Sequence, residues 1–121
     1  MPLIADRFLA EDDDVVDLAT GESVRLTIEA APGARARTDM CDRLFAVRHP
    51  LLRPLIDYGV CASGWFEAHA HLPPLHASGT DARGLALHLV RILRASGIEL
   101  DAAAATRHVR PAVDVAAPAT H

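Results

Sequence analysis

The residues that this sequence lacks already exclude several kinds of active site. The chain contains no lysine, no asparagine and no glutamine, and all twelve of its basic residues are arginines. Without lysine it can neither form a Schiff base on one of its own side chains nor carry the lysine of a phosphate-binding P-loop. The preference for arginine and alanine also indicates a GC-rich bacterial genome as the source.

Aromatic side chains and positive charge are also scarce. Aromatic residues make up 4% of the 121 residues and hydrophobic residues 50%, so leucine, valine, isoleucine and alanine must form most of the core. This length suffices for one small domain with one core. The formal net charge is −4 and no basic stripe is present, which disfavours binding to the phosphates of nucleic acids.

Signals for export or membrane insertion are not evident. No segment approaches the roughly 20 apolar residues that a membrane-spanning helix needs. The first residues lack the basic and apolar regions of a signal peptide. We therefore expect a cytoplasmic protein without membrane contact, in which Cys41 and Cys61 are reduced thiols; a disulfide between them is the alternative.

Alternating segments predict antiparallel strands. In "ESVRLTIEA" at 22–30, aliphatic and polar residues alternate, which is typical of a half-buried strand. Residues 65–72 alternate in the same way. There, tryptophan, glutamate and two histidines share the side that we expect to face solvent. Further strands are predicted at 6–10, 15–19 and 54–58.

Helical periodicity predicts helices over 34–47, 81–96 and 101–108. The first should end before Pro50, because the residue before a proline avoids the helical region. The second should be capped by Thr80 or Asp81 and closed by Gly97. The pattern predicts an α+β fold, with a curled antiparallel sheet of about five strands and one packed helix. One long helix and a short C-terminal helix or tail should follow.

Four segments of the chain follow one another in a familiar order. They are "DLATGESVRLTIEA" at 17–30, "RLFAVRHPLLRPLIDYGV" at 43–60, "GWFEAHAHLPP" at 64–74 and "LALHLVRILRASGIEL" at 85–100. Together they resemble the N-terminal lobe of Ser/Thr-type protein kinases. In that order they resemble the strands around the ATP-contacting lysine, the end of helix C with strand four, strand five with the hinge, and the first large-lobe helix.

The resemblance implies a domain over 1–100 and an Ala-rich short helix with a flexible tail over 101–121. It also shows which catalytic parts are degenerate. Thr27 stands where the family has its lysine, and Met40 stands where helix C has the glutamate that pairs with it. The region of the glycine-rich loop, "AEDDDVVD", contains no glycine, and its carboxylates would repel phosphates.

The catalytic motifs of the large lobe are missing as well. After "ASGIEL" the chain continues with "DAAAATRHVRPAV", which contains no H-R-D motif, and no D-F-G motif follows. Kinases act through positioned charges around the transferred phosphate, and these charges are absent here. The resemblance therefore implies a truncated, pseudokinase-like chain that is not an enzyme and needs no cofactor.

Three histidines form an alternative, metal-binding hypothesis. His69 and His71 alternate along one predicted strand, and His76 follows soon after, which is compatible with a zinc site. The simpler interpretation is the polar side of an exposed strand. Trp65, expected to be partly exposed, and Leu87, which lies among arginines, are candidate contacts for a partner.

We therefore expect a non-catalytic, pseudokinase-like regulatory or protein-interaction domain, as the N-terminal module of a larger bacterial regulator. Its partner would be another protein domain or a second copy, since a small lobe without its large lobe exposes apolar surface. One alternative is a small-ligand, nucleotide-like sensor that uses Ala68, His69 and Ala70. The other is a zinc-binding protein that uses the three histidines.

Overall fold

The computed structural model describes residues 3–11, 14–30 and 34–114. Within it the chain divides into two compact units. The first contains Met1–Phe45 and Pro54–His71, and the second contains Ala46–Arg53 and Leu72–His121. These units divide the chain at different places from the predicted ranges 1–100 and 101–121.

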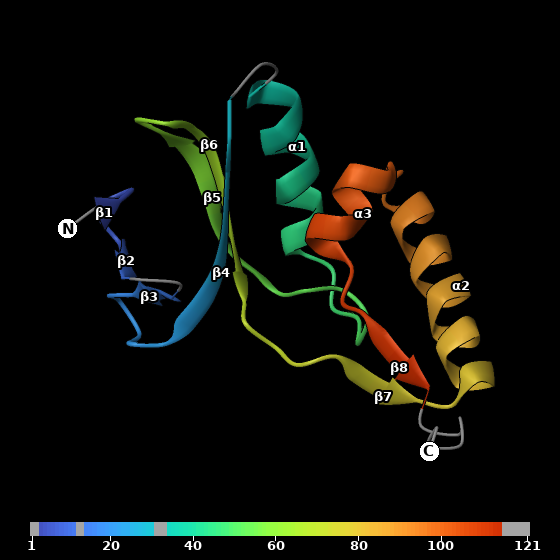
Figure 1. Ribbon diagram of the computed structural model, residues 1–121. Helices are drawn as coiled ribbons and strands as arrows, with labels where there is room; N and C mark the ends of the chain where they lie inside the picture. Colours follow the sequence, from blue (N-terminus) through green and yellow to red (C-terminus); the bar gives the residue numbers. More distant parts are fainter. Residues whose placement is uncertain (1–2, 12–13, 31–33, 115–121) are drawn as a thin grey trace. The chain divides into compact units, whose positions relative to one another are not determined.

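The first unit is built on a six-stranded antiparallel sheet in the order β1-β2-β3-β4-β6-β5. Its elements are β1 (Leu3–Ile4), β2 (Phe8–Glu11), β3 (Asp14–Asp17), β4 (Ser23–Glu29), α1 (Ala34–Phe45), β5 (Leu55–Cys61) and β6 (Gly64–Ala70). In Figure 1, β1 to β3 lie on one side of β4, β5 and β6, and α1 lies on the other.

Apolar residues on one face of β4 and β6 form the core beneath the N-terminal strands. Val24 and Ala70 are cross-strand neighbours, as are Leu26 and Ala68. Phe8 of β2 packs on the same face, with its ring 5.8 Å from that of Phe66. Since β2 and β6 are not adjacent in the strand order, this contact requires the sheet to curl.

The opposite face of the sheet is covered by α1. The helix buries Cys41 and Leu44 on its inner side. The Tyr58 hydroxyl of β5 donates a hydrogen bond to the Asp42 carboxylate of α1. Burial and this neighbouring carboxylate raise the pKa of Tyr58 to about 12, so the phenol stays protonated and keeps α1 attached to the sheet.

The segment "DLATG" forms the turn between β3 and β4. The Asp17 carboxylate accepts hydrogen bonds from the Ala19 backbone N–H at 3.0 Å and from the Thr20 hydroxyl at 3.2 Å. Gly21 has a φ of +76°, a conformation that favours glycine because it has no side chain. The D-x-x-T-G pattern is therefore explained by the chemistry of this turn.

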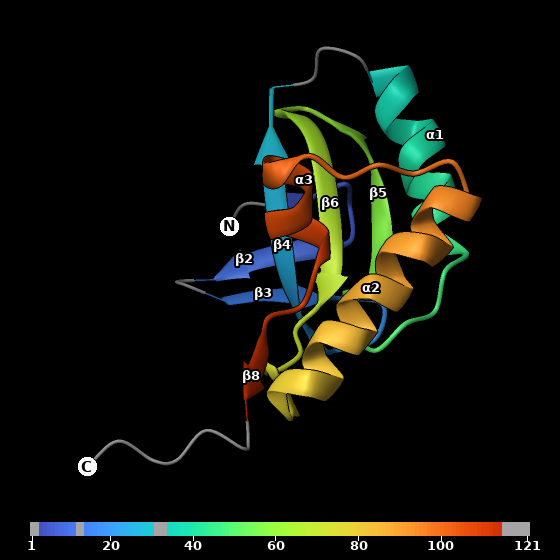
Figure 2. The same cartoon turned by 90° about the vertical axis from the view of Figure 1, so that its right-hand side faces the viewer.

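The second unit contains two helices and a small parallel sheet. Its elements are β7 (Leu75–Ala77), α2 (Gly79–Ala95), α3 (Ala102–His108) and β8 (Ala112–Asp114), and β7 pairs with β8. Figure 2 shows α2 along its length, with β8 beside its first turn. Both helices begin at side-chain caps, because Ser78 accepts from the Asp81 N–H and Asp101 accepts from the Ala104 N–H.

The His-Pro corner belongs to this second unit. His49 Nδ1 accepts a hydrogen bond from the Leu51 N–H at 3.1 Å, and the His49 ring lies 5.3 Å from the His88 ring of α2. Burial and the neighbouring His88 lower the pKa of His49, which favours the neutral ring that this hydrogen bond needs. The Arg53 N–H donates to the His108 carbonyl, so the corner is attached to the end of α3.

The predicted α+β class with an antiparallel sheet is confirmed. The expected count of about five strands was one too low for the sheet, because Leu3–Ile4 adds a two-residue strand. The first helix ends at Phe45 instead of residue 47. The second begins at Gly79 and is capped by Ser78, not by Thr80 or Asp81.

The C-terminal region is more ordered than the sequence predicted. A tail was expected after residue 108, but Ala112–Asp114 forms β8. Local pattern did not predict this strand, because its partner β7 lies far away in the sequence. The part of the predicted tail at 115–121 lies outside the described residues. Among the described helices, none is long and apolar enough to cross a membrane.

Candidate functional site

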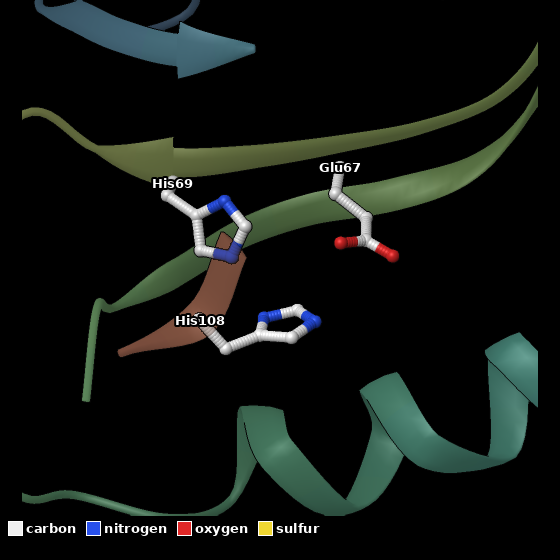
Figure 3. A group of neighbouring side chains, drawn as sticks. All are labelled: Glu67, His69 and His108. Atoms are coloured by element: carbon white, nitrogen blue, oxygen red, sulfur yellow. The ribbon is translucent and has the colours of Figure 1, made fainter. Parts of the chain in front are cut away.

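The face of β6 that lies under α1 carries a row of buried polar side chains. Trp65 and Glu67 are each 1% exposed and His69 is 0% exposed. Figure 3 shows Glu67 and His69 extending from β6 to the same side, toward α1. This alternation was predicted, but the side was expected to face solvent. That expectation was wrong because α1 covers this face of the sheet while β2 covers the other.

Two side chains donate hydrogen bonds to the Glu67 carboxylate. Trp65 Nε1 donates to Oε2 at 2.8 Å, and Cys41 Sγ of α1 lies 3.8 Å from the same oxygen. An indole N–H can only donate and a thiol is a weak donor, so an acceptor such as a carboxylate suits both. We call Cys41, Trp65 and Glu67 the buried carboxylate cluster. It joins α1 to β6 through polar contacts inside the first unit.

Cys41 therefore has a structural part in this cluster. Its side chain is 0% exposed, and neither Cys41 nor Cys61 forms a disulfide. Reactive cysteines lie in partly exposed, electropositive surroundings, whereas this thiol is fully buried beside a carboxylate, as is typical of a structural cysteine. The expectation that both cysteines carry thiols is confirmed.

Thr27 and Met40, where the resemblance would place a lysine and a glutamate, lie close to this cluster in the first unit. Thr27 of β4 is the direct cross-strand neighbour of Glu67 in β6. Met40 of α1 is half-buried and precedes Cys41 in the helix. A phosphate brought to the position of Thr27 would therefore meet a carboxylate, which repels it.

We expect that replacing Glu67 will show how much the buried carboxylate cluster contributes to stability. A Glu67→Met variant leaves the Trp65 indole without this acceptor and should lower the free energy of unfolding by about 1–3 kcal/mol. A Glu67→Gln variant keeps an acceptor oxygen and should lose less. Urea unfolding followed by the fluorescence of Trp65, the single tryptophan, measures both. A Met variant as stable as the wild type would refute this assignment.

The three histidines of the metal hypothesis lie in different settings. His69 is buried in β6, whereas His71 follows the end of that strand at Ala70 and is exposed. His76 is exposed on β7 in the second unit. His108, also labelled in Figure 3, ends α3 in the second unit and is buried. Zinc binding by His69, His71 and His76 stays a prediction.

The two predicted partner contacts differ in accessibility. Trp65 is 1% exposed, so the expectation that it is partly exposed was wrong, because its indole donates to Glu67 beneath α1. Leu87 of α2 is 60% exposed, which confirms the expected exposure. Its use by a partner stays a prediction.

A second polar cluster joins the N-terminal strands of the first unit. Arg7 Nε and Nη2 each donate to a different oxygen of Asp17 at 2.8 Å, and Arg7 Nη1 lies 3.5 Å from Asp57. The hydrogen bonds from Arg7 lower the pKa of Asp17 to about 2. The sequence did not indicate this cluster, because Arg7, Asp17 and Asp57 form no local motif.

Comparison with known proteins adds no relative, since no family model, curated protein or solved structure matches this chain.

Proposed function

We propose that this chain is a non-catalytic, kinase-like domain that binds another protein in the cytoplasm and does not transfer phosphate. The observation that carries the proposal is the pairing of Thr27 with Glu67 across β4 and β6. Phosphoryl transfer depends on positive charge around the phosphates. Here a hydroxyl replaces the expected lysine, and a buried carboxylate stands beside it.

The order of elements in the first unit supports the kinase-like part of the proposal. After the turn at "DLATG" come a strand, a helix and a hairpin of two strands, namely β4, α1, β5 and β6. The resemblance predicts the same order, namely the strand that carries the lysine in kinases, then helix C, strand four and strand five. The curled sheet, in which Phe8 reaches Phe66, agrees with it.

The nucleotide-like sensor is disfavoured by burial. That alternative placed a small ligand along Ala68, His69 and Ala70, and the first two of these residues are each 0% exposed. Protein binding is favoured instead by large exposed aliphatic side chains. Leu18 is 55% exposed, Val60 69% and Leu87 60%. Contiguous exposed apolar side chains mark contacts between proteins, and Leu87 has such a neighbour three residues along α2 in Val90, which is 43% exposed.

A thermal-shift titration with Mg·ATP tests the non-catalytic assignment. A ligand at 100 times its dissociation constant stabilises a protein by about 2.7 kcal/mol, which raises its Tm by several degrees. We expect no such rise with Mg·ATP. ATP without magnesium and inorganic triphosphate are the controls for general anion effects. A rise with Mg·ATP that exceeds both controls would overturn the proposal.

A further inference from the structure

One side of α2 presents apolar and basic residues to solvent. Arg83, Leu87, Val90 and Arg94 follow one another at steps of four, three and four residues, so they form a stripe along the helix. All four are exposed, and Leu87 and Val90 are 60% and 43% accessible. Arg91 lies next to this stripe and is exposed as well. We call these five residues the α2 stripe.

An apolar pocket in the second unit adjoins the α2 stripe. Its volume is about 390 Å³, within the range of small-molecule and side-chain sites. It is lined by Leu89, Val90, Leu93, Arg94, Ile98, Glu99, Leu100, Ala105 and Val109. Val90 and Arg94 belong to both the stripe and the pocket. A helix lying on the stripe could therefore place apolar side chains in the pocket.

The charge of α2 is opposite to that of the chain as a whole. The helix carries three arginines and a single acidic residue, Asp81 in its first turn, whereas the whole chain has a net charge of −4. Arg83, Arg91 and Arg94 form no ion pair with another described residue. The α2 stripe is thus a locally basic, partly apolar surface, which corrects the expectation that the chain has no basic stripe. Such a surface suits an acidic partner with an apolar face.

A second copy of the chain is a poor match for the same surface. Arg83 and Arg91 lie four residues before and four residues after Leu87. If two α2 helices paired antiparallel with Leu87 at the centre, Arg83 of one copy would therefore lie opposite Arg91 of the other. If they paired in parallel, equivalent arginines would meet. Both arrangements bring like charges together, which costs free energy.

We propose that the α2 stripe and its pocket bind an acidic amphipathic helix of another protein. This inference rests on the proposed function, which it makes more specific by naming the surface and the chemistry of the partner. Apolar side chains of the bound helix at i, i+3, i+4 and i+7 would contact Leu87, Val90 and the pocket. Its carboxylates would pair with Arg83, Arg91 and Arg94.

A displayed library of random helical peptides of about 20 residues tests the inference, with the full chain as bait. We expect the enriched peptides to be acidic and to space their apolar residues as one helical face. Against an enriched peptide, Leu87→Ser and Arg91→Glu should each weaken binding about tenfold or more. Fluorescence anisotropy measures the affinity, which should also fall as salt is raised. Leu18→Ser, at 55% exposure in the first unit, is the matched control and should bind like the wild type.

Several outcomes would overturn the inference. They are enrichment of neutral or basic peptides, no enrichment, or binding that Leu87→Ser and Arg91→Glu leave unchanged. Self-association that Leu87→Ser abolishes would also overturn it, since the occupant would then be a second copy. None of these outcomes involves nucleotide binding. The non-catalytic assignment stands or falls separately, on the Mg·ATP titration.

Discussion

Replacing Arg7 with methionine is expected to lower the free energy of unfolding by about 3 kcal/mol or more at pH 7. Methionine keeps an unbranched stem but removes the guanidinium that makes two hydrogen bonds to Asp17 at 2.8 Å. The Asp17 side chain is 1% exposed, so the variant leaves a buried carboxylate without its cation. Removing one partner of a buried ion pair costs about 3–5 kcal/mol, and the partial exposure of Arg7 favours the lower end.

The effect of Arg7→Met should depend on pH in a defined direction. The pKa of Asp17 is lowered from 3.8 to about 2 in the folded wild type. A carboxylate with a lowered pKa stabilises the fold above its unfolded pKa, and this contribution is lost as the pH falls toward 2. It amounts to about 1–2 kcal/mol after allowance for solvent screening. The difference in unfolding free energy between the wild type and Arg7→Met should therefore become smaller as the pH falls from 4 to 2.

Urea unfolding of five proteins measures this prediction: the wild type, Arg7→Met, Asp17→Asn, their double variant and the control Arg25→Met. A double variant, Arg7→Met with Asp17→Asn, should be more stable than Arg7→Met alone, because the unpaired negative charge is gone while an oxygen remains to accept from the turn at Ala19. Arg25→Met is the matched control. Arg25 is an exposed arginine of β4, and its replacement should change stability by less than about 0.5 kcal/mol. If the losses of unfolding free energy in the two single variants simply add in the double variant, Arg7 and Asp17 are not coupled, which would contradict this prediction.

Replacing Phe66 with alanine should lower the free energy of unfolding by about 3–5 kcal/mol. Truncating a buried phenylalanine loses its transfer free energy and leaves a cavity. Phe66 is 3% exposed and packs against Phe8 and Ala68 in the core of the first unit. The contact with Phe8 also keeps the curled N-terminal strands on the sheet, so these strands should become less protected from hydrogen exchange than α1.

Phe45→Ala provides the matched comparison for Phe66→Ala. Phe45 is the last residue of α1 and is 44% exposed. The centre of its ring lies 6.2 Å from the centre of the Tyr58 ring. Because much of this ring is already in water, its removal should cost about 1 kcal/mol or less. The fluorescence of buried Trp65 follows unfolding of the first unit in both variants. Equal losses of unfolding free energy in Phe66→Ala and Phe45→Ala would contradict the placement of Phe66 in the core.

Local pattern predicted most of the secondary structure. The alternation predicted over 22–30 contains β4 (Ser23–Glu29), which is one residue shorter at each end, and the helix expected over 101–108 is observed as α3 (Ala102–His108). Alternation and helical periodicity are properties of neighbouring residues, so the sequence alone contains them. The second small sheet was missed, because the pairing of Leu75–Ala77 with Ala112–Asp114 links segments that no local rule connects.

The sequence by itself determined the α+β class and the alternating face of β6, and it excluded lysine chemistry by composition. Only the tertiary structure decided that this face is interior. An alternating strand has two faces, and the pattern cannot say whether a helix covers the polar one. The packing of α1 over β6 turned Trp65 and Glu67 from expected surface residues into buried hydrogen-bond partners. The fold likewise joined Arg7 to Asp17 and left Leu87 exposed on α2.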